Sequence, residues 1–303
     1  MSAGRFPPLA ATVVGSFPAK PPMKIMEASY RDGSDPFSYS LEESVRAQLG
    51  AGIDIVSDGQ TRDTMVNLFA KHLRGVRMRE RPVVVREIEW TGSITADDLR
   101  LAKSLLPPGK MLKGIVTGPF TLANGLEDKF YGSTEKLAFA LAEAMNKEAR
   151  AIEPIVDMIQ FDEPFFSVEF PEYAPALVET ARRGIAKPVA LHVCGDVAPI
   201  FHKLAELPVD LLDHEFAAHP ELLRTVADVS FAQTIGFGCV RSDVNEAEKP
   251  EIIELAIRNA VEALGAEKIV VDPDCGLRHL DPAVASAKLR NMVVARDRVR
   301  SLL

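Results

Sequence analysis

Three short segments of the sequence carry the side chains with the strongest potential for chemistry. Residues 191–196 read LHVCGD, residues 212–216 read LDHEF and residues 271–276 read VDPDCG. Together they offer a neutral imidazole, two thiols and a carboxylate, which are ligand types that zinc prefers. His192 and Cys194 are close in sequence, but their partners lie about twenty and eighty residues downstream. Ligands so far apart need a preformed scaffold, which favours a catalytic metal site over a zinc finger.

The elements that must position these residues are short apolar runs that alternate with segments of helical period. The runs lack clean apolar–polar alternation, as strands buried on both faces should. Eight strand–helix units in series predict an α/β fold, a single (β/α)8 TIM barrel. The rival doubly wound sheet usually carries a glycine-rich phosphate loop, and neither common form of that loop occurs here. The eight candidate strands are 11–16, 53–57, 112–117, 156–161, 188–193, 209–214, 231–237 and 268–272.

Helix signals and one irregular segment complete the predicted organisation. Ser133 can cap one helix, Pro250 can open another that ends before Gly265, and Asp281 with Pro282 can start the last. Residues 75–107 fit the repeat poorly. Within them, 83–85 and 88–90 indicate a β-hairpin inserted after the second helix. We therefore expect residues 1–303 to form a single catalytic barrel with an insertion at about 75–107.

The candidate ligands fall at corresponding ends of the predicted strands. His192 and Cys194 end the fifth strand, Glu215 ends the sixth and Cys275 follows the eighth. In a barrel these ends open on one face, where active sites lie. The rival ligands are His202, His214, His219 and His279, of which His214 should point away from Glu215 by strand alternation. Cys239 is expected to be a packed thiol near the site.

Such a ligand set would suit the activation of a thiol. One histidine, two cysteines and one glutamate can close a tetrahedron, and the carboxylate is the ligand that a substrate thiol can most readily replace. A free thiol with a pKa near 8.5 is only about 3% thiolate at pH 7. Metal coordination removes its proton outright. The pattern therefore favours thiol alkylation over activation of water.

Other polar residues are predicted on the same face. Gly15 and Ser16 end the first strand, where glycine permits close backbone approach and the hydroxyl can hold a carboxylate; a plain turn is the alternative. Asp162 and Glu163 end the fourth strand. One of these acids could bind an ammonium group, and the alternative is an N-cap for the next helix.

Composition excludes several classes of function. A net charge of −8 argues against nucleic-acid binding, because phosphates need a basic surface. Three distant cysteines form no disulfide framework, which indicates a reducing cytoplasm. No apolar run approaches the roughly 18 residues of a membrane span, so no membrane association is expected.

Five short motifs form a recognisable set: VGSFP at 14–18, QFDEP at 160–164, LHVCG at 191–195, HEF at 214–216 and DPDCG at 272–276. Together they resemble the catalytic, C-terminal barrel of cobalamin-independent methionine synthase. Their order and spacing match over nearly the whole chain, and the short archaeal-type core enzymes are the most similar. The resemblance implies that His192, Cys194, Glu215 and Cys275 hold zinc. It also implies that the backbone around Gly15 and Ser16, with Asp162, holds the amino-acid end of homocysteine.

Departures from the family pattern shape the predicted methyl donor. The full-length enzyme has a second barrel that helps bind polyglutamyl methyltetrahydrofolate, and we expect none here. The family's glutamate after strand two, which contacts the substrate amino group, corresponds to Thr61, with Gln60 beside it. Its histidine beyond strand seven, which serves folate departure, corresponds to Asp243. A cob(I)alamin leaving group needs no proton, so we expect methylcobalamin or a methylated corrinoid protein as donor.

The predicted function is methyl transfer to zinc-bound homocysteine, which forms methionine. One alternative is a corrinoid-linked methyltransferase for another thiol, such as coenzyme M or methanethiol. Another is uroporphyrinogen decarboxylase, whose similar barrel needs no metal and should carry a basic cleft. A non-enzymatic zinc protein that docks a corrinoid protein is the third.

Overall fold

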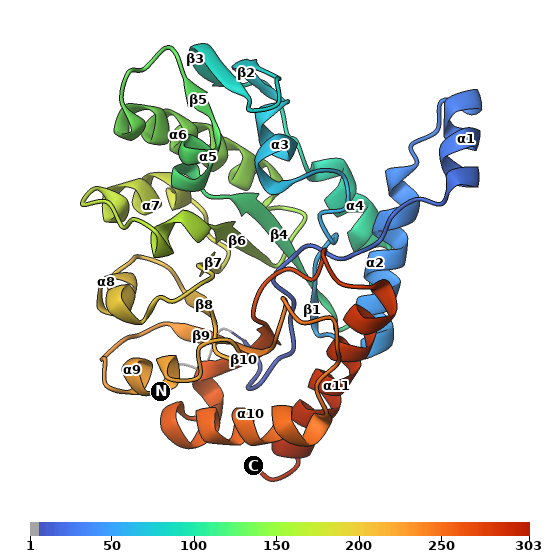
Figure 1. Cartoon of the computed structure of the whole chain (residues 1–303), viewed down its shortest axis with the longest axis vertical. Coiled ribbons are helices and arrows are strands. Elements are labelled where there is room, and N and C mark those ends of the chain that lie inside the picture. The colour runs from blue at the N-terminus through green and yellow to red at the C-terminus, as the bar shows by residue number, and fades with distance from the viewer. Residues whose placement is uncertain (1–5) are drawn as a thin grey trace.

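The computed structural model describes residues 6–303, and a seven-stranded parallel sheet curves around its centre (Figure 1). The strand order is β1-β4-β6-β7-β8-β9-β10, which follows the order of the chain. Helices lie between successive strands and cover the outside of the sheet. The strands are β1 Ile55–Val56, β4 Met111–Thr117, β6 Met158–Asp162, β7 Val189–His192, β8 Leu211–Glu215, β9 Thr234–Val240 and β10 Ile269–Pro273.

The predicted first strand, 11–16, is reduced to two bridges that close the barrel. Ala11 bridges in parallel to Val271 on β10, and Thr12 bridges in parallel to Ile55 on β1. This segment therefore joins the two edges of the sheet, and the predicted TIM barrel is confirmed. The ladder stops after Thr12 because the next carbonyls accept from side chains. Gln160 Nε2 donates to the Val14 carbonyl at 2.9 Å, and Ser57 Oγ donates to that of Gly15 at 3.1 Å.

The predicted helix signals are confirmed. Ser133 Oγ accepts from the Lys136 amide and caps α6, whereas prolines stand in the first turns of α10 and α11. Helix α1 projects away from the barrel (Figure 1). The helices are α1 Met23–Asp32, α2 Phe37–Ala51, α3 Met65–Ala70, α4 Ala96–Ser104, α5 Pro119–Gly125, α6 Thr134–Ile152, α7 Ala174–Arg182, α8 Phe201–Leu204, α9 Leu222–Ala227, α10 Pro250–Leu264 and α11 Pro282–Arg300, with 3-10 turns η1 Pro164–Ser167, η2 Ala198–Ile200 and η3 Ala266–Lys268.

A small second sheet holds the hairpin, but its pairing differs from the prediction. Strand β3, Val83–Trp90, contains both segments that were expected to pair with each other. Its antiparallel partner is β2, Leu73–Arg77, and β5, Glu127–Asp128, pairs on its other edge. The chain reverses at the charged residues before Pro82 rather than at 86–87. The hairpin follows α3, and residues 96–104 form α4.

The interior of the barrel is layered along the strands. An apolar cluster fills the end where the strands begin; its members are Phe6, Ala10, Ile55, Met158, Ala190, Leu211 and Val270. Side chains two positions further along four of these strands point inward as well and are polar. This second layer contains Lys113, Gln160, Asp213 and Asp272, all with at most 1% of their surface exposed. The site lies above this polar layer, at the carboxyl ends of the strands.

Within residues 6–303, none of the helices combines the length and the apolar character that crossing a bilayer requires.

Candidate metal and substrate site

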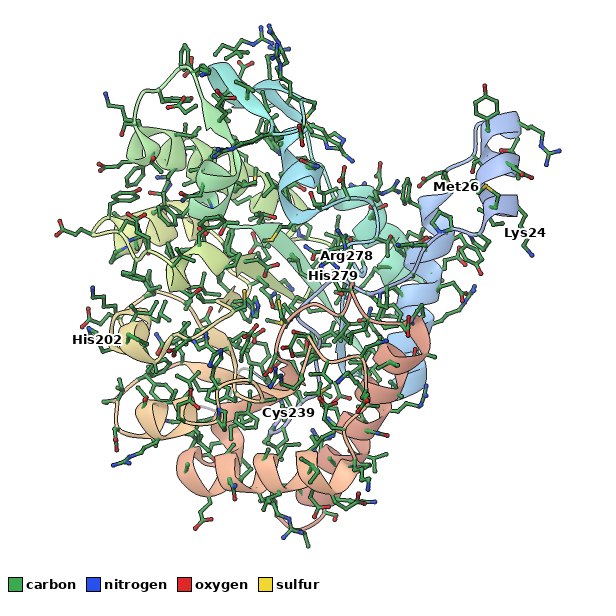
Figure 2. All side chains as sticks on the ribbon, in the orientation of Figure 1. Lys24, Met26, His202, Cys239, Arg278 and His279 are labelled. Atoms are coloured by element: carbon green, nitrogen blue, oxygen red, sulfur yellow. The ribbon has the colours of Figure 1, made fainter. Side chains whose placement is uncertain are left out.

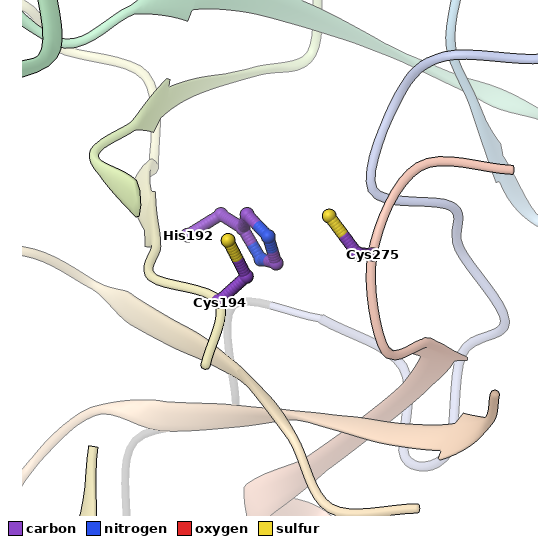
Figure 3. A group of neighbouring side chains, drawn as sticks. All are labelled: His192, Cys194 and Cys275. Atoms are coloured by element: carbon purple, nitrogen blue, oxygen red, sulfur yellow. The ribbon is translucent and has the colours of Figure 1, made fainter. Parts of the chain in front are cut away.

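Three of the four predicted ligands come together at the carboxyl ends of β7 and β10. His192 is the last residue of β7, Cys194 follows it in the loop, and Cys275 lies just after β10. Figure 3 shows Cys275 approaching the His192 ring from the segment opposite Cys194. One ligand atom from each of the three residues lies within 4.8 Å of the others. Ligand atoms on a tetrahedral zinc lie roughly 3.3–3.8 Å apart, so only a small closure is needed.

The surroundings of His192 fit a metal ligand. The ring is 2% exposed, and its Nδ1 lies 3.3 Å from Asp213 Oδ1. Its Nε2 is buried without a hydrogen-bond partner among the described residues. A carboxylate behind one nitrogen and an open coordination position at the other is the usual environment of a zinc-bound histidine. Burial opposes protonation, but the charge and contact of Asp213, with Cys275, raise the pKa of His192 well above its ordinary value.

The two thiols complete a donor set that suits zinc. Cys275 contacts Cys194, and this contact together with burial raises the pKa of Cys275 well above its ordinary value. The Cys275 thiol therefore stays protonated until a cation displaces its proton. Two sulfurs and one imidazole nitrogen leave one position of a tetrahedron for a fourth ligand.

Glu215, the fourth predicted ligand, ends β8 but is outside this group. Its Oε2 lies 3.8 Å from Nε2 of His219. It lines a second cavity, of about 310 Å³, with His219, Arg241, Asp243 and Asp274. The role of Glu215 as a ligand stays a prediction.

The remaining candidate ligands also lie outside the group. His214 points outward: its Nδ1 is 3.0 Å from the Val193 carbonyl, and its ring meets the edge of Phe201. Burial lowers the pKa of His214 to about 4. The Cys239 thiol is buried and donates to the Asp272 carbonyl at 3.5 Å. Figure 2 shows His202 on the outer helix α8, and His279 is exposed on the loop after β10.

A cavity of about 350 Å³ is lined by the three predicted ligands His192, Cys194 and Cys275. Asp162, at the end of β6, lines it and is only 5% exposed. Gln160 Nε2 donates to Asp162 Oδ1 at 2.7 Å, and Lys113 Nζ donates to Gln160 Oε1 at 2.6 Å. Burial raises the pKa of Asp162 to about 6, although His192, Gln160 and Lys113 favour its charged form. The carboxylate is therefore fixed in orientation and faces the cavity.

The neighbouring acid, Glu163, has a structural task. Its carboxylate accepts from the amides of Phe120 and Thr121, at 2.9 and 2.7 Å, and from the Thr121 hydroxyl at 2.7 Å. These amides belong to the first turn of α5, so Glu163 caps a helix that precedes it in the chain. The sequence left both acids open for either role, and the tertiary structure separates them.

The predicted substrate contacts divide between the two cavities. Ser16 and Gln60 line the larger one, whereas Thr61 is not among its lining residues. Gly15 lies beneath Gln60: a Cβ there would come within 2.8 Å of Gln60 Oε1. Asp243 lines the cavity of Glu215 and pairs with Arg241 at 2.6 Å.

Two functional candidates were missed from the sequence. Arg278 lines the larger cavity, and Lys113 lies under it as the buried cation of the polar layer. The signal for Lys113 was a single lysine within an otherwise apolar strand.

Comparison with known proteins gives this geometry a family. The sequence profile described as "Cobalamin-independent synthase, Catalytic domain" matches residues 9–297. The chain belongs to the cobalamin-independent methionine synthase family. It is 36% identical to a methionine synthase of Methanothermobacter marburgensis, covering 95% of this chain and 99% of the relative. It is 35% identical to a methionine synthase of Methanocaldococcus jannaschii, covering 95% and 98%.

A solved structure agrees with the sequence relatives. A B12-independent methionine synthase from Shewanella sp. W3-18-1, in complex with selenomethionine, superposes with a TM-score of 0.86 at 28% identity, covering 98% of this chain and 99% of that one. The predicted resemblance to short, archaeal-type methionine synthases is confirmed. The chain is a methyltransferase of the methionine synthase type, which acts on homocysteine.

Membership of this family corrects the predicted methyl donor. The family is cobalamin-independent, so methylcobalamin as donor and a corrinoid protein as partner were wrong predictions. The prediction had two grounds: the second, folate-binding barrel was not expected here, and Asp243 stands where the family has a histidine. In the folded chain, however, His219 lines the same cavity as Asp243. The cavity next to Asp243 therefore contains a histidine, His219, which comes from the loop after β8. An alignment of the sequences alone could not show this.

Proposed function

We propose that this chain forms methionine by methyl transfer to the thiolate of homocysteine, on zinc held by His192, Cys194 and Cys275. Glu215 serves as the fourth, exchangeable ligand. The observation that carries the proposal is a group of two thiols and one imidazole that opens on a cavity with a buried carboxylate. Bound zinc would ionise the substrate thiol at neutral pH and leave it nucleophilic. The ligand thiols must stay reduced, which suits the cytoplasm.

Side chains of the cavity give the acceptor its orientation. Asp162 accepts from the ammonium group, because Gln160 holds its other oxygen and directs one oxygen to the cavity. Ser16, which lines the same cavity, supplies a hydroxyl for the carboxylate group. An acceptor held by its amino-acid end can extend its sulfur toward the group of His192, Cys194 and Cys275, where zinc would bind. The Shewanella relative in complex with selenomethionine supports an amino acid of this shape as ligand.

The donor in this proposal is not a corrinoid. Methyltetrahydrofolate, the donor that the resemblance associates with the family, is the first to be tested. The thiol acceptors coenzyme M and methanethiol lack an ammonium group, so the oxygen of Asp162 that Gln160 does not hold would gain no partner from them.

The test is a methyl-transfer assay in cobalamin-free buffer. Zinc-loaded protein, homocysteine and methyltetrahydrofolate should yield methionine, detected by mass spectrometry. Cys275→Ser should lose both zinc and turnover, measured by elemental analysis and the same assay. If the fully zinc-loaded protein makes no methionine, the proposal is wrong.

A further inference from the structure

Arg278 lies at the larger cavity on the loop after β10 (Figure 2). Its Nη2 donates to the backbone carbonyls of Gln60 and Asp63. These two bonds fix the guanidinium plane against the loop after β1. Its Nε and Nη1 make no hydrogen bond within the described part of the chain, and Arg278 has five donors in all.

The charge of Arg278 is not balanced by a neighbouring carboxylate. Other arginines around the barrel mouth are paired: Arg62 with Asp35 and Asp98, and Arg241 with Asp243. Among residues 6–303, no carboxylate lies within ion-pair distance of Arg278. Burial lowers the pKa of Arg278, and the charge of Asp63 opposes this only in part. A half-buried cation without a counter-ion calls for an anion from outside the chain.

A second unsatisfied donor lines the same cavity. Gln60 is only 8% exposed, and its Nε2 finds no hydrogen-bond partner among residues 6–303. Its φ of 44° lies in the left-handed region, which is unfavourable for a residue other than glycine. Buried orphan donors and backbone strain of this kind concentrate at ligand sites.

The two donors share one corner of the cavity. The Arg278 guanidinium bonds to the Gln60 carbonyl, and the Leu277 amide donates to the Ser16 carbonyl at 2.7 Å. The loop after β10 is thus fastened to the segment that carries Ser16. This corner offers a guanidinium, an amide N–H and a hydroxyl, whereas the buried acid of the cavity is Asp162 on β6.

We propose that Arg278 and Gln60 bind a carboxylate of a reactant, and that this is the α-carboxylate of the acceptor amino acid. The inference rests on the proposed function and deepens it. An acceptor bridging Asp162 and Arg278 is recognised as a zwitterion, and a thiol without a carboxylate is rejected because the buried donors would stay unpaired. The other source of the same chemistry is the glutamate carboxylate of methyltetrahydrofolate.

The test compares Arg278→Met with the control Arg81→Met. Arg81 Nη2 also donates to two backbone carbonyls, those of Asn124 and Leu126, but away from the cavity. Calorimetry on the zinc-loaded proteins measures binding of methionine and of its decarboxylated analogue, 3-(methylthio)propylamine. Arg278→Met should weaken methionine about 10- to 100-fold and leave the amine within about twofold. Arg278→Lys should keep part of the affinity, and Arg81→Met all of it.

Binding measurements with the two kinds of ligand distinguish the α-carboxylate of the acceptor from the glutamate carboxylate of methyltetrahydrofolate. Unchanged methionine affinity with weaker methyltetrahydrofolate binding in Arg278→Met assigns the site to the donor and overturns the acceptor assignment. If binding of methionine and of the amine weakens equally, or if no ligand changes in affinity, the carboxylate site is overturned altogether.

Circular dichroism confirms that each variant is folded. Gln60→Leu provides an independent variant, which should bind methionine less tightly, by a smaller factor than Arg278→Met, and bind the amine unchanged. Because binding is measured without turnover, a wild-type protein that binds methionine through Arg278 but makes none contradicts only the proposed function.

Discussion

Replacing Asp162 with asparagine should weaken binding of the acceptor amino acid, because the Gln160 side chain forces the new amide to turn its NH2 group toward the cavity. Lys113 donates to Gln160 Oε1 at 2.6 Å, so Gln160 must turn its NH2 group toward Val14 and Asp162, at 2.9 and 2.7 Å. In Asp162→Asn the side-chain oxygen has to face that NH2 group, because two donors cannot pair. The new amide NH2 therefore points into the cavity, where an ammonium group also offers only donors.

The size of the effect follows from the bond that is lost. A hydrogen bond to a charged group contributes about 1.5–3 kcal/mol, which corresponds to roughly 10- to 150-fold in affinity. The exposed NH2 group adds a mismatch, so Asp162→Asn should bind methionine no better than Asp162→Ala.

The wild-type protein should also show a pH dependence. The pKa of Asp162 in the empty site is raised to about 6, and the ammonium group binds the ionised form. Methionine affinity should therefore be full above about pH 7 and fall as pH drops below 6.

Isothermal titration calorimetry with methionine between pH 5 and pH 8 measures both effects on zinc-loaded protein. The control is Glu163→Gln, which removes the neighbouring carboxylate that caps α5 and should leave the affinity within about threefold. An Asp162→Asn variant that binds methionine as tightly as wild type would refute the reasoning. If the wild-type protein bound methionine with the same affinity from pH 5 to pH 8, the predicted effect of Asp162 protonation on binding would be refuted.

Three further predictions concern the metal and the scaffold. Cys239→Ala should keep its zinc and most of its activity, because this thiol is outside the ligand group, whereas Cys194→Ser should lose zinc in the same elemental analysis. Exhaustive treatment with a zinc chelator should abolish methyl transfer, and added zinc should restore it; activity that persists without metal would contradict the site. Glu148 is fully buried and accepts from the Trp90 indole and the amides of residues 94 and 95 at 2.8–2.9 Å. Urea unfolding of Glu148→Ala should show a loss of roughly 3–5 kcal/mol with unchanged zinc content, since these donors lose their partner inside the protein.

The sequence alone predicted the barrel fold and the three residues, His192, Cys194 and Cys275, that come together at the carboxyl ends of its strands. Apolar runs and helix signals are local, and seven of the eight candidate strands overlap strands of the observed sheet. Because each strand of a barrel ends on one face, positions at strand ends predicted that His192, Cys194 and Cys275 would meet. The exception, 11–16, forms bridges only, because side chains from other strands take the carbonyls of Val14 and Gly15.

Only the tertiary structure showed which of two similar residues faces the cavity, and which residues distant in sequence lie next to each other. Asp162 and Glu163 are alike in sequence, and only the position of α5 makes one a cap and leaves the other at the cavity. The loop after β10 brings Arg278 to Gln60, more than two hundred residues away, and the cavity of Asp243 receives His219. Hydrogen-bond partners and counter-ions depend on which loops share a space. A linear pattern records the type and spacing of residues but not that shared space. It therefore predicted the three residues that meet at the cavity and missed the hydrogen-bond partners around them.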